Sequence, residues 1–195
     1  MEKDISCVIL AGGLNKRFGG KGKSHLEIGG VKIIDRILSV MEELFPELII
    51  VTNTPVEFAV SQPHKIVEDQ FKKAGPLGGI HAGLKASSNE AVFVLAGDMP
   101  FPDKKIIELQ IEVFRKSNYD VIIPKIGNFI EPLHSVYSKS ILEKLEKFLK
   151  EKKNNAVRDF LMEIKVFYLP LPDTSDNRKA FTNINSPEDL FKTFI

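Results

Sequence analysis

Short hydrophobic runs rich in β-branched residues recur along the chain. Several of them are hydrophobic at every position rather than at alternate ones, which is typical of strands covered on both faces. The pattern therefore predicts strands at ISCVIL 5–10, LIIVT 48–52, KIV 65–67, AVFVLA 91–96, DVIIP 120–124 and KVFYL 165–169.

Longer segments between these runs have the spacing of amphipathic helices. In VKIIDRILSVMEELF, six hydrophobic residues form one stripe, and segments 103–116 and 138–151 follow the same pattern. SPEDLFKTF begins like a helix, with Ser186 as the N-cap and Pro187 at the first helical position. The hydrophobic stripe of VKIIDRILSVMEELF consists of Ile33, Ile34, Ile37, Leu38, Met41 and Leu44.

This alternation of strands and helices predicts an α/β fold, in which helices cover both faces of a mostly parallel sheet. The expected architecture is a Rossmann-like three-layer αβα sandwich. Residues 125–137 are punctuated by glycine and proline and are expected to hold an irregular or antiparallel excursion. Because the chain shows no internal repeat and no long linker, residues 1–195 are expected to form a single domain.

Composition narrows the function classes. The 27 basic and 26 acidic residues give a net charge of +1, which disfavours nucleic acid and anionic membranes as partners. No run of 18 apolar residues could span a membrane, and the single Cys7 fits a reducing compartment, so the cytoplasm is the expected location. The four histidines lack the spacing of zinc ligands, so surface or satisfied roles are expected for them.

One loop nevertheless concentrates positive charge. The segment CVILAGGLNKRFGGKGKSHLEIGG, residues 7–30, leaves a predicted strand and then combines glycines with Lys16, Arg17, Lys21 and Lys23. Glycines let backbone N–H groups approach an anion closely, and the cations neutralise phosphate charge. The loop is not a Walker A motif, because Arg17 occupies the place of the required first glycine. The dinucleotide fingerprint also fails, at His25.

Polar residues follow several predicted strands, at the edge of the sheet where ligands bind in such folds. Asp98 comes just after AVFVLA and would suit Mg²⁺ that bridges to nucleotide phosphates. Asn53 and Asp69 suit recognition of a base or ribose, although each is also a common turn residue. Asn183 and Asn185 alternate along an extended segment, so they would face the same side.

The pattern L-A-G-G-x-x-x-R-x-G-x-x-x-K resembles the signature of nucleotidyltransferases with a glycosyltransferase-A-like fold. Its LAGG form is similar to the molybdenum cofactor guanylyltransferase branch of that family. The loop departs from the family pattern at Gly22, where Asp is usual, and at Phe18, where Met is usual. Further similar segments, in the family's order, are VTN 51–53, VEDQFKKAGPLGGIHAGL 67–84, VLAGDMPF 94–101, EPLHSVY 131–137 and FTNINSPEDL 181–190.

The resemblance implies Mg²⁺-dependent transfer of GMP from GTP to the phosphate of molybdopterin or its molybdenum-loaded form, with release of pyrophosphate. It assigns Arg17 and Lys23 to the triphosphate, Asp98 to Mg²⁺, and Asn183 and Asn185 to the acceptor side. A molybdenum-inserting protein would be a further partner. The residues assigned to guanosine are Leu10, Ala11, Gly12, Gly13, Asn53 and Asp69.

Two alternatives stay open at this point. One is a related nucleotidyltransferase that uses CTP, or a sugar or polyol phosphate as acceptor. The other is a non-catalytic GTP-binding adaptor module. The combination of Arg17, Lys23 and Asp98 favours an enzyme, since a protein that only binds GTP would not need all three.

Overall fold

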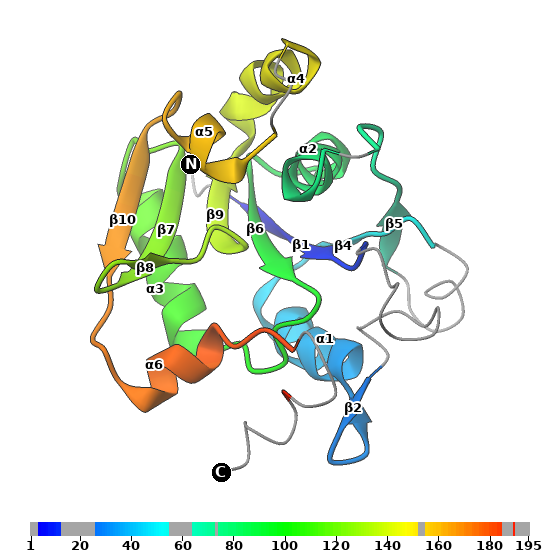
Figure 1. The fold of residues 1–195 in the computed structure, drawn as a ribbon, viewed down its shortest axis with the longest axis vertical. Helices are drawn as coiled ribbons and strands as arrows, with labels where there is room; N and C mark the ends of the chain where they lie inside the picture. The colour runs from blue at the N-terminus through cyan, green and yellow to red at the C-terminus, as the bar shows by residue number, and fades with distance from the viewer. Residues whose placement is uncertain are drawn as a thin grey trace.

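The main sheet of the computed structural model contains eight strands (Figure 1). The structure describes residues 4–12, 26–54, 64–72, 74–151, 155–184 and 189. Seven strands lie side by side in the order β10-β7-β9-β6-β1-β4-β5, and β8 pairs with β7. Their bounds are β1 Ile5–Leu10, β4 Leu48–Val51, β5 Lys65–Val67, β6 Ala91–Ala96, β7 Val121–Ile126, β8 Phe129–Ile130, β9 His134–Ser138 and β10 Val166–Pro170.

Parallel pairing dominates this sheet. Strands β5, β4, β1 and β6 are parallel neighbours, and β10 is parallel to β7. β9 runs antiparallel to both β6 and β7, and β8 runs antiparallel to β7. The predicted strands and the antiparallel excursion within 125–137 are therefore confirmed.

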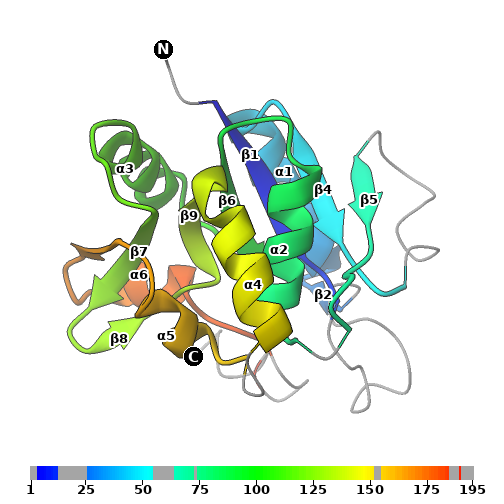
Figure 2. The same ribbon diagram turned by 90° about the horizontal axis from the view of Figure 1, so that it is seen from above.

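Helices cover both faces of the sheet (Figure 2). α1 (Ile33–Leu44) and α3 (Lys104–Arg115) pack on one face, and α2 (Pro76–Ala86), α4 (Leu142–Glu151) and α5 (Val157–Leu161) pack on the other. A last short helix, α6, spans Ser175–Ala180.

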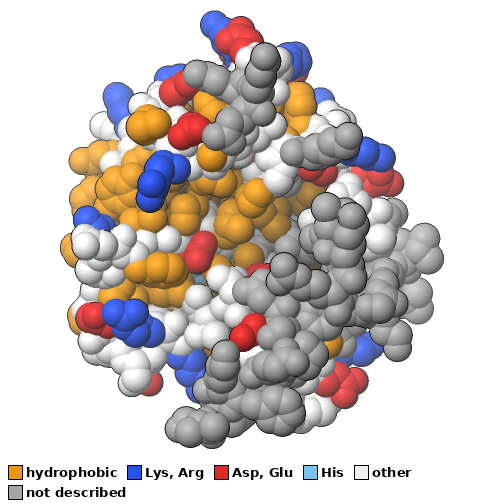
Figure 3. Space-filling view, in the orientation of Figure 1, with side chains coloured by type: hydrophobic (Ala, Val, Ile, Leu, Met, Phe, Trp, Pro, Cys, Tyr) orange, Lys and Arg blue, Asp and Glu red, His pale blue; other side chains and the backbone are white. Residues whose placement is uncertain are grey.

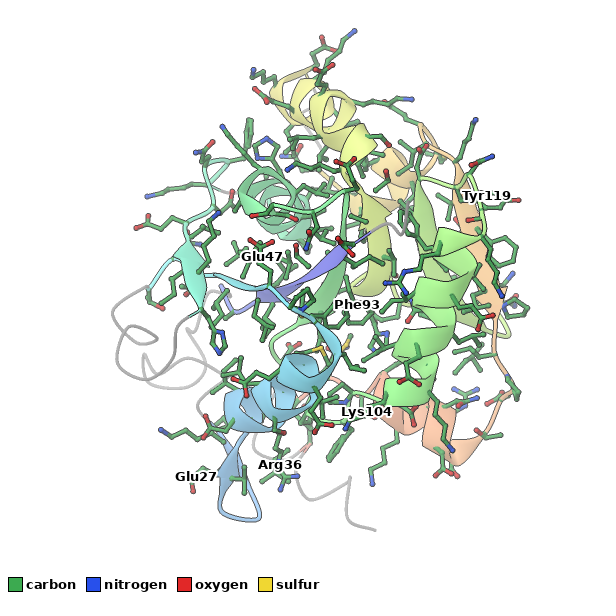
Figure 4. The ribbon with its side chains drawn as sticks, turned by 180° about the vertical axis from the view of Figure 1, so that it is seen from behind. Glu27, Arg36, Glu47, Phe93, Lys104 and Tyr119 are labelled. Atoms are coloured by element: carbon green, nitrogen blue, oxygen red, sulfur yellow. The ribbon has the colours of Figure 1, made fainter. Side chains whose placement is uncertain are left out.

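Alternation along the strands divides the core between these two faces. On β1, Cys7 and Ile9 pack with α1, whereas Val8 packs with α2. Figure 4 shows Phe93 of β6 between α1 and α3, where its ring stacks on that of Phe45 at a centroid distance of 5.5 Å. The three-layer αβα sandwich predicted from the sequence is confirmed.

Some local features differ from the expected elements. The helix expected over 138–151 begins as a 3₁₀ turn at Lys139–Ile141, before α4. A small hairpin, β2 (Glu27–Ile28) and β3 (Val31–Lys32), was not predicted, although its Gly-Gly turn is a standard hairpin signal. α6 was not predicted either. The helix start expected at Ser186 lies outside the described residues. No helix in the described part of the chain is long and apolar enough to cross a membrane.

His134 gives the stability of this fold a pH dependence. Its imidazole is completely buried, lies edge-on to Phe93 and Phe181 at 5.0 Å, and has Nδ1 3.1 Å from Gln110 Oε1. Burial lowers the pKa of His134 to about 4, from an ordinary value of 6.5. As pH falls, His134 is therefore protonated in the unfolded chain before it is protonated in the folded protein. The free energy of unfolding decreases as pH falls from about 6.5 to about 4.

The free energy of unfolding is expected to be about 2 to 3 kcal/mol lower at pH 4.5 than at pH 7 on account of this group. Urea unfolding at the two pH values measures the difference. His134→Gln does not titrate in this range, and its difference is expected to be smaller than that of wild type by this amount. An equal pH dependence in the two proteins would show that another group is responsible.

Candidate active site

The strand order creates a switch point between β1 and β6. From β1 the chain adds β4 and then β5 on one side, after which β6 is added on the other side of β1. In open α/β sheets, ligands bind beyond the carboxyl ends of the strands at such a point. Here the Leu10 carbonyl accepts from Gly97 N–H (3.0 Å), and Ala11 N–H donates to the Val51 carbonyl (2.9 Å). The predicted Leu10–Ala11 segment therefore lies at this point.

Glycines keep the backbones close together here. A Cβ at Gly97 would lie 3.0 Å from the Leu10 carbonyl oxygen, too close for an ordinary contact. Gly12 lies beside the turn after β4, because a Cβ on it would be 3.5 Å from both the backbone N and Nδ2 of Asn53. The structure thus brings together four of the residues predicted for guanosine: Leu10, Ala11, Gly12 and Asn53.

Asp69 is held against the first turn of α2. Its side chain is only 8% exposed, and Oδ1 accepts from Phe71 N–H (2.7 Å). A Cβ on Gly78 would lie 2.4 Å from Oδ2 and 2.6 Å from Oδ1, so only glycine leaves room for this carboxylate. Burial raises the pKa of Asp69. The GPLGG segment, residues 75–79, therefore places Asp69 beside the amino end of a helix, where negative charge is favoured.

Asp98 lies two residues beyond β6 and is partly buried. Its carbonyl oxygen accepts from Ile184 N–H (2.9 Å), and Ile184 is completely buried. This contact brings the half-buried Asn183 beside Asp98, although the two are far apart in the sequence. The structure thus joins the predicted metal ligand to the predicted acceptor segment.

Glu131 lies near this site, and the sequence patterns did not single it out. Antiparallel pairing aligns Leu95 with His134, and Ala96 N–H donates to the Leu133 carbonyl (2.9 Å). Asp98 and Glu131 each lie two residues beyond this last contact, in the segments that follow β6 and precede β9. The glutamate is 8% exposed, and burial, together with the charge of Asp98, raises its pKa. The segment EPLHSVY, which is similar to the family, contains this glutamate, but the sequence alone assigned it no role.

The donors at this position suit a hard cation. Carboxylates of Asp98 and Glu131 and the amide oxygen of Asn183 are the oxygen ligands that Mg²⁺ prefers. The described residues contain no cluster of three or more His, Cys, Asp or Glu side chains able to hold a metal by themselves. A magnesium ion here would complete its coordination with water and phosphate oxygens, as is usual for Mg²⁺ with nucleotides.

The site residues follow the order of the strands. Asp69 comes after β5, Asn53 after β4, the Leu10–Gly12 segment after β1, Asp98 after β6, and Glu131 precedes β9. From β5 to β6 is three strand spacings, about 14 Å. One elongated ligand could therefore meet the predicted guanosine residues at one end and Asp98 at the other.

Some predicted residues fall outside this description. Gly13, Arg17, Lys23 and Asn185 lie outside the described residues. Arg158, which by sequence could bind an acceptor phosphate or equally be a solvated helix residue, is exposed on α5. This helix precedes β10 and lies beside the ends of β7 and β10 where these strands begin (Figure 1). The structure does not bring Arg158 to the carboxyl edge.

The described histidines do not gather into a metal-binding cluster. His64 contacts Glu42 (3.0 Å), and His25 lies outside the described residues. His81 is buried, and burial lowers its pKa. Neither of its ring nitrogens has a hydrogen-bond partner among the described residues, and Glu146 Oε2 is 3.7 Å from Nε2. The expectation of a surface or satisfied role is therefore wrong for His81.

A cavity of about 530 Å³ lies at the opposite edge of the sheet, where β4 and β5 begin. None of the predicted site residues lines it. Its polar groups contact one another or the nearby backbone: Glu47 accepts from Ser88 N–H (2.9 Å), and Lys65 Nζ donates to the Ala86 carbonyl (2.5 Å). We therefore place the candidate active site at the carboxyl edge, on topology and residue chemistry.

Comparison with known proteins gives matches over most of the chain. Residues 7–165 match the family model of the MobA-like NTP transferase domain. The chain is 38% identical to a protein of Natranaerobius thermophilus named probable molybdenum cofactor guanylyltransferase, over 97% of this chain and 95% of that protein. It is 32% identical to the molybdenum cofactor guanylyltransferase of Desulfosudis oleivorans, over 96% and 93% of the two chains.

Solved structures share the fold. Molybdopterin-guanine dinucleotide biosynthesis protein A of Archaeoglobus fulgidus superposes with a TM-score of 0.81 at 24% identity, over 96% of each chain. A 4-diphosphocytidyl-2C-methyl-D-erythritol synthase of Anaerococcus prevotii superposes with a TM-score of 0.71 at 19% identity, over 98% of this chain and 95% of that one. At such identities the likeness concerns the fold alone.

Proposed function

Because this chain belongs to the MobA-like NTP transferase family, we propose that it is a molybdenum cofactor guanylyltransferase. It transfers GMP from GTP to the terminal phosphate of molybdopterin or its molybdenum-loaded form, which yields the guanine dinucleotide cofactor and pyrophosphate. The observation that carries the proposal is the arrangement of Asp69, Asn53, the Leu10–Gly12 backbone and Asp98 along the carboxyl edge of one sheet.

We assign the guanosine to the β4–β5 end of this edge. Asp69 accepts from the guanine N1 and N2 groups, while Asn53 and the Leu10–Gly13 backbone contact the nucleoside. Arg17 and Lys23 neutralise the triphosphate, and Asp98 holds Mg²⁺. A bound magnesium ion would supply positive charge to the phosphates.

The acceptor then lies on the β9 side of Asp98. Asn183 reaches that side through the contact between Ile184 and Asp98, and we assign Asn183 and Asn185 to acceptor binding. Hydrophobic side chains gather over β7, β9 and β10 on the face shown in Figure 3, which suits the flat ring of a pterin.

The chemistry needs little from the protein beyond alignment and charge. An oxygen of the acceptor phosphate, already an anion, attacks the α-phosphorus of GTP, and the bond from that phosphorus to the bridging oxygen of pyrophosphate breaks. Since the nucleophile carries no proton to be removed, no strong general base is required. Rate enhancement comes from in-line positioning and from stabilisation of charge on the transferred and leaving groups.

The decisive test is an assay with GTP, Mg²⁺ and molybdopterin that detects guanine dinucleotide and pyrophosphate. We expect both products with GTP, and little product when CTP, UTP or ATP replaces it. Selective use of CTP, or product only with a sugar or polyol phosphate, would replace the proposal by that related transferase. GTP binding without acceptor-dependent pyrophosphate release would indicate an adaptor module.

Three further points remain proposals. Residues 1–195 are taken to form a single nucleotidyltransferase domain. The cytoplasm is the expected location, on the sequence grounds given above. A molybdenum-inserting protein that hands over the acceptor is a candidate partner.

A further inference from the structure

Glu131 is fixed in place by its own loop. Its Oε1 accepts from Leu133 N–H (3.0 Å), and its carbonyl oxygen accepts from Ser135 Oγ (2.8 Å) and His134 N–H (3.2 Å). Its N–H donates to the Pro124 carbonyl (3.3 Å). These contacts tie the glutamate to β7 and β9 and leave its side chain little freedom.

The other carboxylate oxygen is not used by these contacts. Glu131 Oε2 has no hydrogen-bond partner among the described residues, and Glu131 forms no ion pair with a described lysine or arginine. Glu131 as a whole residue is only 8% exposed, while Oε2 keeps some contact with solvent. A buried charge in this state is costly unless another group compensates it.

The surroundings of Glu131 make the cost larger. The contact between Ala96 N–H and the Leu133 carbonyl brings the segments of Asp98 and Glu131 together, and negative charges on both side chains repel each other. Two like charges close together disfavour the charged form of each group. A divalent cation between the two carboxylates would turn this repulsion into attraction, and Mg²⁺ is commonly held by one or two carboxylates together with phosphate oxygens.

We propose that Glu131 is the second carboxylate of the divalent-cation site, and that it holds the ion together with Asp98. The proposal rests on the proposed function, because it takes Asp98 to be a metal ligand. Glu131 enters the site from β9, on the acceptor side. Glu131 would therefore bind the cation from the side where the acceptor is expected. Asp98 would bind it from the side of the switch point between β1 and β6.

Glu131→Gln tests this proposal with little structural disturbance. The amide oxygen of glutamine can still accept from Leu133 N–H, but the negative charge is lost. Binding of Mn²⁺ is measured through the electron paramagnetic resonance signal of the free ion, with and without GTP. The variant is expected to bind Mn²⁺ about tenfold or more weakly than wild type. Its urea unfolding midpoint without metal is expected to be no lower than that of wild type.

Two further variants separate the possible causes. Glu90→Gln removes an exposed glutamate at the other end of β6 and is expected to leave Mn²⁺ affinity unchanged. Wild-type affinity in Glu131→Gln, with weakened binding in Asp98→Asn, would overturn the role of Glu131 alone. Unchanged affinity in both would overturn the metal site of the proposed function as well.

A charge-retaining variant covers the case in which Glu131→Gln folds poorly. Glu131→Asp withdraws the carboxylate by one methylene, so its Mn²⁺ affinity is expected to fall between those of wild type and Asp98→Asn. Affinity equal to that of wild type would contradict the proposal.

Discussion

Asp98→Asn is expected to lower kcat for GMP transfer by about 10²- to 10³-fold, the usual cost of removing one group that stabilises transition-state charge. Asparagine keeps the shape of the side chain and loses the charge that would hold Mg²⁺ against the phosphates. The contact between Ile184 N–H and Asp98 should persist, because it uses the backbone carbonyl of Asp98.

Steady-state assays over a range of Mg²⁺ concentrations would measure this loss, with Asp35→Asn as the matched control. Asp35 is exposed on α1 and belongs to no part of the site, so its variant should keep wild-type turnover. Near-wild-type turnover of Asp98→Asn at saturating Mg²⁺ would remove the metal role from Asp98.

Gly78→Ala is expected to weaken GTP binding by roughly thirtyfold, which corresponds to about 2 kcal/mol. A Cβ at this position would lie 2.4 Å from Asp69 Oδ2, so the carboxylate must leave the first turn of α2. The charged hydrogen bonds that we assign to guanine would then be lost. Alanine is otherwise the better helix former by about 1 kcal/mol, so propensity alone predicts no damage.

Isothermal titration calorimetry with GTP measures the effect, and Gly83→Ala provides the comparison. A Cβ on Gly83 would lie 2.5 Å from Val8 Cγ1, in the core. Gly83 has no contact of this kind with Asp69. That variant should lose stability and, while folded, keep its affinity for GTP. If folded Gly78→Ala bound GTP as tightly as wild type, the contact between Asp69 and α2 would not serve nucleotide binding.

The sequence predicted the layers of this fold well because strands buried on both faces leave a continuous hydrophobic signal. It also predicted that Asn53, Asp69 and Asp98 lie at one edge, since each directly follows such a strand and parallel strands end on the same side. The hairpin of β2 and β3 was not predicted, because its strands contain two residues each, too few for a periodic hydrophobic pattern.

The position of Glu131 near the site was not predicted, for a different reason. It precedes a strand instead of following one, and only the antiparallel direction of β9 brings that end to the carboxyl edge. Pairing between β6 and β9 then brings its segment beside that of Asp98. Strand direction and register depend on contacts between distant segments, which local hydrophobic patterning does not report.

The sequence by itself determined the fold class, the family and the chemical character of the loop that follows β1, because each of these is written in local patterns of residues. Tertiary structure alone decided which distant groups meet: Asp69 against Gly78, Ile184 N–H against the Asp98 carbonyl, and Ala96 N–H against the Leu133 carbonyl. These contacts depend on how the helices pack and how the strands are ordered, and both involve residues far apart in the sequence.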